Sequence, residues 1–172
     1  MEMERGFRGR LADYLNTSCP IQVKITTSGG AVYDTFCFGL DAEDKISDDE
    51  YVIFYNQLRS PGGEIVYSTD HSEAIYEVQL KKLPGRIAKL AFAISIDGEG
   101  TMHDVKAHRI QIVQNDEVRL EVGLEGADFG DEKVIIGIEL YYTKEWRIAV
   151  VARGFNEGLS ELLRRYNVQT ES

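Results

Sequence analysis

Residues 21–40 read IQVKITTSGGAVYDTFCFGL and contain two strand patterns separated by a turn. Residues 21–27 alternate apolar and polar side chains, a pattern typical of a β-strand with one buried face. The Ser-Gly-Gly sequence at 28–30 is a turn signal, because glycine adopts backbone conformations that other residues avoid. Residues 31–40 then form a second strand pattern. The segment therefore predicts two β-strands and no helix.

Short strand patterns continue along most of the chain. They occur at residues 50–57, 63–69, 74–80, 86–97, 108–114, 117–124 and 133–153, the last holding two strands around a turn. Residues 86–97 are nearly continuously apolar from Leu90 to Ile96, which predicts a strand that is covered on both faces. About ten strands with turns every 8–12 residues or so indicate an all-β fold, a two-sheet antiparallel β-sandwich or a barrel.

One C-terminal helix is predicted over residues 156–166. Asn156 is a candidate N-cap, since its side chain can accept a hydrogen bond from the first turn. Apolar side chains then recur at helical spacing and form one stripe, at Leu159, Leu162, Leu163 and Tyr166. We expect this stripe to pack against a sheet edge. Residues 1–19 are expected to form an N-terminal extension, and residues 20–168 a single sandwich domain.

Composition excludes several classes of protein. The 172 residues include 19 Lys and Arg against 29 Asp and Glu, a net charge of −10. Such a chain repels phosphate backbones, so nucleic-acid binding is not expected. No apolar run of about 18 residues predicts a membrane span. The N-terminal sequence lacks the apolar core of a secretory signal, and two cysteines do not suggest a disulfide framework. We therefore expect a cytoplasmic protein.

The sequence offers no recognisable catalytic set. The three histidines, His71, His103 and His108, are not accompanied by a Gly-x-Ser-x-Gly motif. Cys37 lies between two phenylalanines within a predicted strand, where a buried, unreactive thiol is expected. Zinc-ligand spacing and phosphate-binding glycine loops are also missing. The chain is therefore predicted not to be an enzyme.

Acidic residues allow two interpretations. Residues 41–50, DAEDKISDDE, form either a solvated turn or a calcium-binding loop, although they lack the EF-hand spacing. Asp34, Asn56, Asp70 and Asp97 are polar residues within or at the ends of predicted strands. A strand-borne aspartate needs a partner or a cation if it is buried. The residues alone leave open whether these four cap strand ends or bind a metal ion.

Several ordered motifs resemble a known family. Residues 54–70, FYNQLRSPGGEIVYSTD, are similar to a motif of the TerD domain family of tellurium-resistance and general stress proteins. Further similar stretches are VYDTFCFGLDAEDKIS at 32–47, GADFGDEKVIIGIELYY at 126–142 and EWRIAVVARGFNEGL at 145–159. The resemblance covers residues 21–166 and is closest to the TerA-like branch of the family.

The resemblance implies a calcium-binding β-sandwich without enzymatic activity. The family's metal ligands correspond here to Asp34, Asn56, Asp70 and Asp97, with Glu73 as the remnant of a long acidic loop. Several family carboxylates are missing, and calcium affinity falls with the number of charged ligands. The resemblance thus implies Ca²⁺ binding that is weak or lost, and partners among other tellurium-resistance and stress proteins.

Aromatic residues support an alternative function. Tyr33, Tyr51, Tyr55 and Tyr67 lie in the same part of the chain as the candidate ligands. If their rings were exposed, they could form the platform of a carbohydrate- or small-ligand-binding β-sandwich. If they were buried, they would be ordinary core residues.

Overall fold

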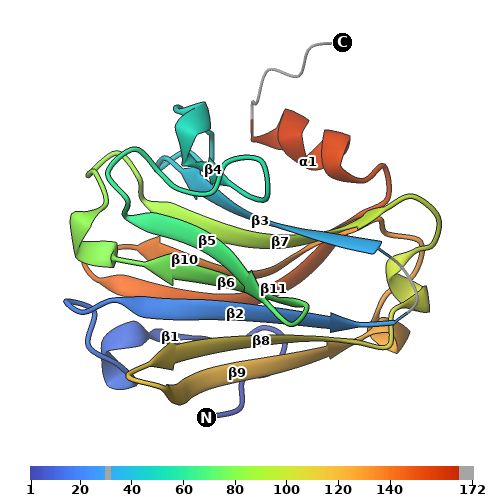
Figure 1. The fold of residues 1–172 in the computed structure, drawn as a ribbon, viewed down its shortest axis with the longest axis horizontal. Helices are drawn as coiled ribbons and strands as arrows, with labels where there is room; N and C mark the ends of the chain where they lie inside the picture. Colours follow the sequence, from blue (N-terminus) through green and yellow to red (C-terminus); the bar gives the residue numbers. More distant parts are fainter. Residues whose placement is uncertain (30–31, 167–172) are drawn as a thin grey trace.

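The computed structural model describes residues 1–29 and 32–166, which form two antiparallel sheets packed face to face (Figure 1). The predicted fold class, an all-β sandwich with one C-terminal helix, is confirmed. The six-stranded sheet has the order β1 (Arg8–Arg10), β11 (Trp146–Phe155), β10 (Val134–Tyr142), β7 (Lys89–Asp97), β3 (Val32–Leu40) and β4 (Val52–Ile53). The five-stranded sheet has the order β5 (Ile65–Asp70), β6 (Glu73–Val78), β2 (Ile21–Ser28), β8 (Ala107–Gln114) and β9 (Glu117–Glu125).

Short 3₁₀ helices connect the strands. They are η1 (Leu11–Asp13), η2 (Asp49–Tyr51), η3 (Leu80–Lys82), η4 (Met102–Asp104) and η5 (Gly126–Asp128). Among the described residues, no helix has the length and apolarity needed to cross a bilayer.

Side-chain alternation along each strand builds the core between the sheets. Ile21, Val23 and Ile25 of β2 point inward, and Leu90 and Phe92 of β7 meet them from the other sheet. Successive side chains of a strand point to opposite faces, so every second residue reaches this core. The apolar residues of the 21–27 segment therefore face the core between the sheets, as the sequence predicts.

The outer face of the six-stranded sheet is also covered. Helix α1 (Leu159–Arg165) lies on this face (Figure 1), and the buried residues there include Phe38, Ala91, Ala93 and Leu162. This second cluster explains why β7 is apolar on both faces, as predicted. The helix packs on a sheet face, whereas the sequence led us to expect a sheet edge.

The start of α1 differs from the prediction. The helix begins at Leu159, its N-cap is Gly158, and no side chain caps it. Gly158 has a φ of 80°, and its carbonyl oxygen accepts hydrogen bonds from the backbone N–H groups of Glu161 and Leu162. Asn156 therefore is not the cap, because the chain turns at the glycine two residues later, where a positive φ is needed.

Two further segments depart from their predicted form. Residues 1–19 contribute strand β1, which pairs with β11, and their apolar side chains Met3, Leu11 and Leu15 are buried in the core. The predicted strand at 50–57 is reduced to β4, because the backbones of Phe54 and Gln57 hydrogen-bond to each other and close a tight turn. Gly30 of the predicted turn and residues 167–168 of the predicted domain lie outside the described residues.

Candidate functional site

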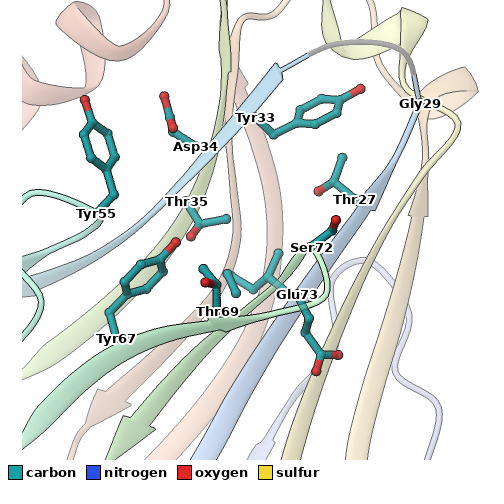
Figure 2. A pocket seen from close by; sticks show the side chains of 12 residues that line it. Thr27, Gly29, Tyr33, Asp34, Thr35, Tyr55, Tyr67, Thr69, Ser72 and Glu73 are labelled. Atoms are coloured by element: carbon teal, nitrogen blue, oxygen red, sulfur yellow. The ribbon is translucent and has the colours of Figure 1, made fainter.

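A cavity of about 390 Å³ opens at one end of the sandwich, between the two sheets (Figure 2). Its lining is rich in hydroxyl groups, which come from β2, β3, β5 and the loops beside them: Thr27, Tyr33, Thr35, Tyr55, Tyr67, Thr69 and Ser72. Ile25 and Ala74 provide an apolar base. We call this space the end cavity.

Strand β3 contributes Tyr33, Asp34 and Thr35 to the lining of the end cavity, and its side chains alternate between the inner and outer faces of its sheet. Thr35 points inward, where its hydroxyl forms a 2.8 Å hydrogen bond with the hydroxyl of the buried Tyr76. Tyr33 also packs against the inner core, and its hydroxyl oxygen is buried without a hydrogen-bond partner in residues 1–29 and 32–166. Asp34 lies between them in sequence, so its side chain points to the outer face, as Figure 2 shows.

Asp34 and Asp97 are neighbours on that outer face. In the pairing of β3 with β7, Asp34 faces Ser95 and Val32 faces Asp97, so the two aspartates are diagonal neighbours. Partial burial raises the pKa of Asp34 above its usual value, and the negative charge of Asp97 raises it further. Within the described part of the chain, no basic side chain lowers the pKa of Asp34. The structure thus makes Asp34 and Asp97 diagonal neighbours on one sheet face.

The other two predicted acidic ligands lie in the five-stranded sheet. Asp70 ends β5 and Glu73 begins β6, and only two residues, His71 and Ser72, connect the strands. Both connecting residues have positive φ values, 49° and 71°, as a tight two-residue hairpin turn requires. Asp70 is exposed at this tip, and one of its oxygens lies 2.5 Å from the ring Nδ1 of His71. Because the connection is so short, Asp70 remains at the end of β5 in the five-stranded sheet.

Glu73 points to the opposite outer surface of the sandwich from Asp34. Its carboxylate accepts a hydrogen bond from the Thr26 hydroxyl at 3.3 Å and lies 3.9 Å from the Lys24 ammonium. Figure 2 shows the carboxylate turned away from the end cavity. Glu73 is therefore part of a surface pair on the five-stranded sheet.

Asn56 is exposed in the turn that follows β4, directly after Tyr55, which Figure 2 shows on the same side of β3 as Asp34. Of the five predicted ligands, the structure thus places Asp34 and Asp97 together, Asn56 in a neighbouring turn, and Asp70 and Glu73 in the other sheet. Across the described part of the chain, no group of three or more His, Cys, Asp or Glu side chains is arranged to hold a metal ion. Two carboxylates supply only part of the six to eight oxygens that calcium prefers.

The acidic run at residues 41–50 is used to build a turn. One oxygen of Asp41 accepts hydrogen bonds from the backbone N–H groups of Glu43 and Lys45 at 2.9 and 3.0 Å. Asp48 caps η2 by accepting from the N–H of Glu50 at 3.0 Å. These carboxylates already satisfy backbone donors, which agrees with the interpretation of this run as a surface turn.

Three of the four candidate tyrosines line the end cavity. Tyr55 is 59% exposed, and Tyr33 and Tyr67 are partly buried. Tyr51 is only 2% exposed and donates a 2.5 Å hydrogen bond to Glu64, so it belongs to the core. The tyrosines therefore form part of a cavity wall and not a flat platform.

Candidate nucleophiles and bases are poorly placed for catalysis. Cys37 is fully buried, and burial raises the pKa of its thiol far above the usual range. A hydroxyl–imidazole contact of 3.0 Å joins Thr27 to Nδ1 of His108. However, the other ring nitrogen of His108 has no partner among the described residues, so no carboxylate orients the ring.

The sequence prediction missed the threonine and serine hydroxyls of the end cavity. The strand pattern could have identified Thr27 and Thr69. Each lies two residues beyond an inward-facing residue of its own strand, so its side chain is expected to point inward as well. No such signal existed for Ser72, which lies in the two-residue turn of the β5–β6 hairpin and reaches the cavity because β6 pairs with β2.

Comparison with known proteins identifies the family. The sequence profile described as "TerD domain" matches residues 2–166. The chain is 30% identical over 156 residues to general stress protein 16U of Bacillus subtilis (strain 168), covering 79% of this chain and 77% of that protein. It is 27% identical over 117 residues to tellurium resistance protein TerA of Alcaligenes sp, covering 68% of this chain but only 34% of that protein.

A solved structure shares the fold. A homologue of telluride resistance protein (TerD) from Streptomyces coelicolor A3(2) superposes with a TM-score of 0.65 at 16% identity, covering 84% of this chain and 94% of that one. The profile match over nearly the whole chain and the identity to general stress protein 16U lead to one conclusion. The chain belongs to the TerD domain family of tellurium-resistance and stress proteins.

Proposed function

We propose that this protein is a non-enzymatic binding module of the tellurium-resistance and stress response, which binds a divalent cation weakly through Asp34 and Asp97. One observation carries the proposal: Asp34 and Asp97 are diagonal neighbours on the outer face of the six-stranded sheet, and among the described residues no basic side chain lowers the raised pKa of Asp34. Backbone carbonyls, water and the amide of nearby Asn56 would supply the remaining ligands. In the cell the module would act by engaging other proteins of the same response.

Asp34→Asn tests the cation site, because it removes a charge and keeps the shape of the side chain. With so few carboxylates, we expect the unmodified protein to bind Ca²⁺ with a Kd of about 10⁻⁴–10⁻³ M. Ten millimolar calcium, roughly ten to a hundred times such a Kd, would then stabilise the fold by about 1.4–2.7 kcal/mol. The Asp34→Asn variant should show no rise in Tm when calcium is added to chelator-treated protein.

The same variant has a second expected result without calcium. The pKa of Asp34 is raised in the folded protein, so its ionised form opposes folding at pH values above that pKa. Asp34→Asn should therefore unfold at a slightly higher temperature than the unmodified protein at neutral pH. Asp116→Asn, in the exposed β8–β9 turn, is the matched control and should keep the calcium response. A calcium response that survives in Asp34→Asn would disprove the assignment.

The end cavity supports a second candidate function, binding of a small polyhydroxylated ligand. Its hydroxyl-rich wall contains the partly buried rings of Tyr33 and Tyr67 beside the exposed ring of Tyr55. The buried Tyr33 hydroxyl has no partner among the described residues, so a ligand could satisfy it. A volume of about 390 Å³ lies within the usual range for small-molecule pockets.

Tyr55→Ala tests this second function. We expect NMR titration with glucose or inositol to shift signals of Thr27, Thr69 and Ser72, and the variant to bind several-fold more weakly, because it loses one cavity wall. Tyr142→Ala is the control, since Tyr142 is similarly exposed (52%) but lies at the end of β10, outside the cavity. Shifts that are absent, or equal in both variants, would eliminate the cavity as a ligand site.

A further inference from the structure

A second cavity, of about 430 Å³, lies on the outer face of the six-stranded sheet at the C-terminal end of α1. Its floor is formed by side chains of β10 and β11, and its rim by residues 43–45 and by the last residues of α1. We call it the helix cavity. None of the residues proposed above for the cation or the polyhydroxylated ligand lines it.

The helix cavity is basic, although the chain as a whole carries a net charge of −10. Five basic side chains line it against three acidic ones. Lys89 is neutralised locally, since its ammonium lies 2.8 Å from Asp44 and 3.5 Å from Glu139. Arg153 and Arg165, in contrast, form no ion pair within residues 1–29 and 32–166. Their charges are therefore available to an anionic ligand.

The two arginines are held beside the same aromatic ring. The guanidinium carbons of Arg153 and Arg165 lie 5.2 and 5.3 Å from the centre of the Phe155 ring. An arginine that stacks on a ring keeps the N–H groups at the edge of its guanidinium plane free for hydrogen bonds. Arg153 reaches this position because it shares the outer face of β11 with Phe155, two residues away.

An unpartnered hydroxyl group completes the site. Tyr166 is only 6% exposed, and its hydroxyl oxygen has no hydrogen-bond partner among the described residues. Burial, followed by the charges of Glu139 and Asp44, raises the pKa of this hydroxyl, while the charges of Arg153 and Arg165 act to lower it. Tyr166 therefore remains a protonated donor at neutral pH. A buried donor without an acceptor destabilises the fold unless a ligand or water satisfies it.

We propose that the helix cavity binds a small organic anion. Its oxyanion group, a phosphate or a carboxylate, accepts hydrogen bonds from Arg153, Arg165 and the Tyr166 hydroxyl. Its organic part packs on Ile136, Val151 and Leu162, which supply the apolar portion of the lining. The cavity is larger than an inorganic ion needs and falls within the range of small-molecule pockets.

Titration calorimetry of the full chain with phenyl phosphate, benzoate and inorganic phosphate tests this site. We expect at least one of the two organic anions to bind more tightly than inorganic phosphate. Arg153→Gln and Arg165→Gln should each weaken that binding about tenfold, since each removes a charged hydrogen-bond donor. Tyr166→Phe should weaken it several-fold and yet unfold at the same or a higher temperature, because it deletes an unsatisfied hydroxyl.

Arg164→Gln is the matched control. Arg164 is the neighbour of Arg165 in α1, but its guanidinium pairs with Glu157 at 2.6 Å and does not line the helix cavity. This variant should bind the organic anion as the unmodified protein does. The proposal would be overturned by any of three results: no binding of either organic anion up to about 10 mM, equal weakening in Arg164→Gln, or binding of inorganic phosphate as tight as that of both organic anions.

Discussion

Leu162→Ala is expected to lower the free energy of unfolding by about 2–5 kcal/mol. Leu162 has no exposed surface and belongs to the cluster between α1 and the outer face of the six-stranded sheet, with Phe38, Phe155 and Tyr166. Alanine would remove buried methyl groups and leave a cavity that a sheet face cannot close. The seven-residue helix has no side-chain cap, so packing is its main source of stability. Chemical denaturation of the purified variant measures the change.

Leu163→Ala provides the comparison within the same helix. Leu163 is only partly buried against the same cluster, so its truncation should cost clearly less. Equal losses for the two variants would show that the deeper burial of Leu162 adds no stability, since neither change lowers helix propensity. An unchanged unfolding midpoint for Leu162→Ala would show that the helix does not contribute to the stability of the sandwich.

Acidification is expected to destabilise the protein through His108. This side chain is fully buried, and burial lowers its pKa from the ordinary 6.5 to about 4. Between these pH values the unfolded chain binds a proton that the folded protein excludes. Stability is therefore lost as pH falls from about 6.5 to about 4, by roughly 3 kcal/mol in total. Denaturation midpoints measured across this pH range give the slope.

His108→Phe separates this effect from the titration of carboxylates. Phenylalanine fills a similar volume between the rings of Tyr33 and Phe129, which approach His108 edge-on. The variant loses the hydrogen bond with Thr27 at every pH, but it has no proton to exclude, so its stability should fall less steeply below pH 6.5. Identical slopes for the two proteins would show that His108 is not the responsible group.

Strand patterns along the chain were predictable because they are local. The alternation in residues 21–27, the apolar segment at 86–97 and the stripe of α1 each reflect which side of one element is buried. Boundaries that depend on turn geometry were less accurate. The start of α1 is set by the positive φ of Gly158, and β4 is shortened by the turn between Phe54 and Gln57.

The candidate sites combine residues that are far apart in the chain, so the local sequence pattern predicts them only in part. The sequence identified Asp34 and Asp97 as unusual strand residues, and the register of β3 with β7 does make them neighbours. It could not place Asp70 and Glu73, because a two-residue hairpin keeps both in the other sheet. The helix cavity combines Arg153 of β11 with Arg165 and Tyr166 at the end of α1, and only the packing of the helix on the sheet brings them together.

By itself, the sequence determined the strands of residues 21–40, their inward and outward faces, and the family of the protein. The sequence could not determine that β2 and β3, which follow each other in the chain, belong to different sheets. That choice depends on pairing with β6, β7 and β8, which lie far away in the chain. Side-chain direction follows from the local geometry of a strand, whereas the sheet that a strand joins follows from contacts with distant segments. For this reason the outward-pointing carboxylates of Asp34 and Glu73 lie on opposite surfaces of the sandwich, and only the tertiary structure separates them.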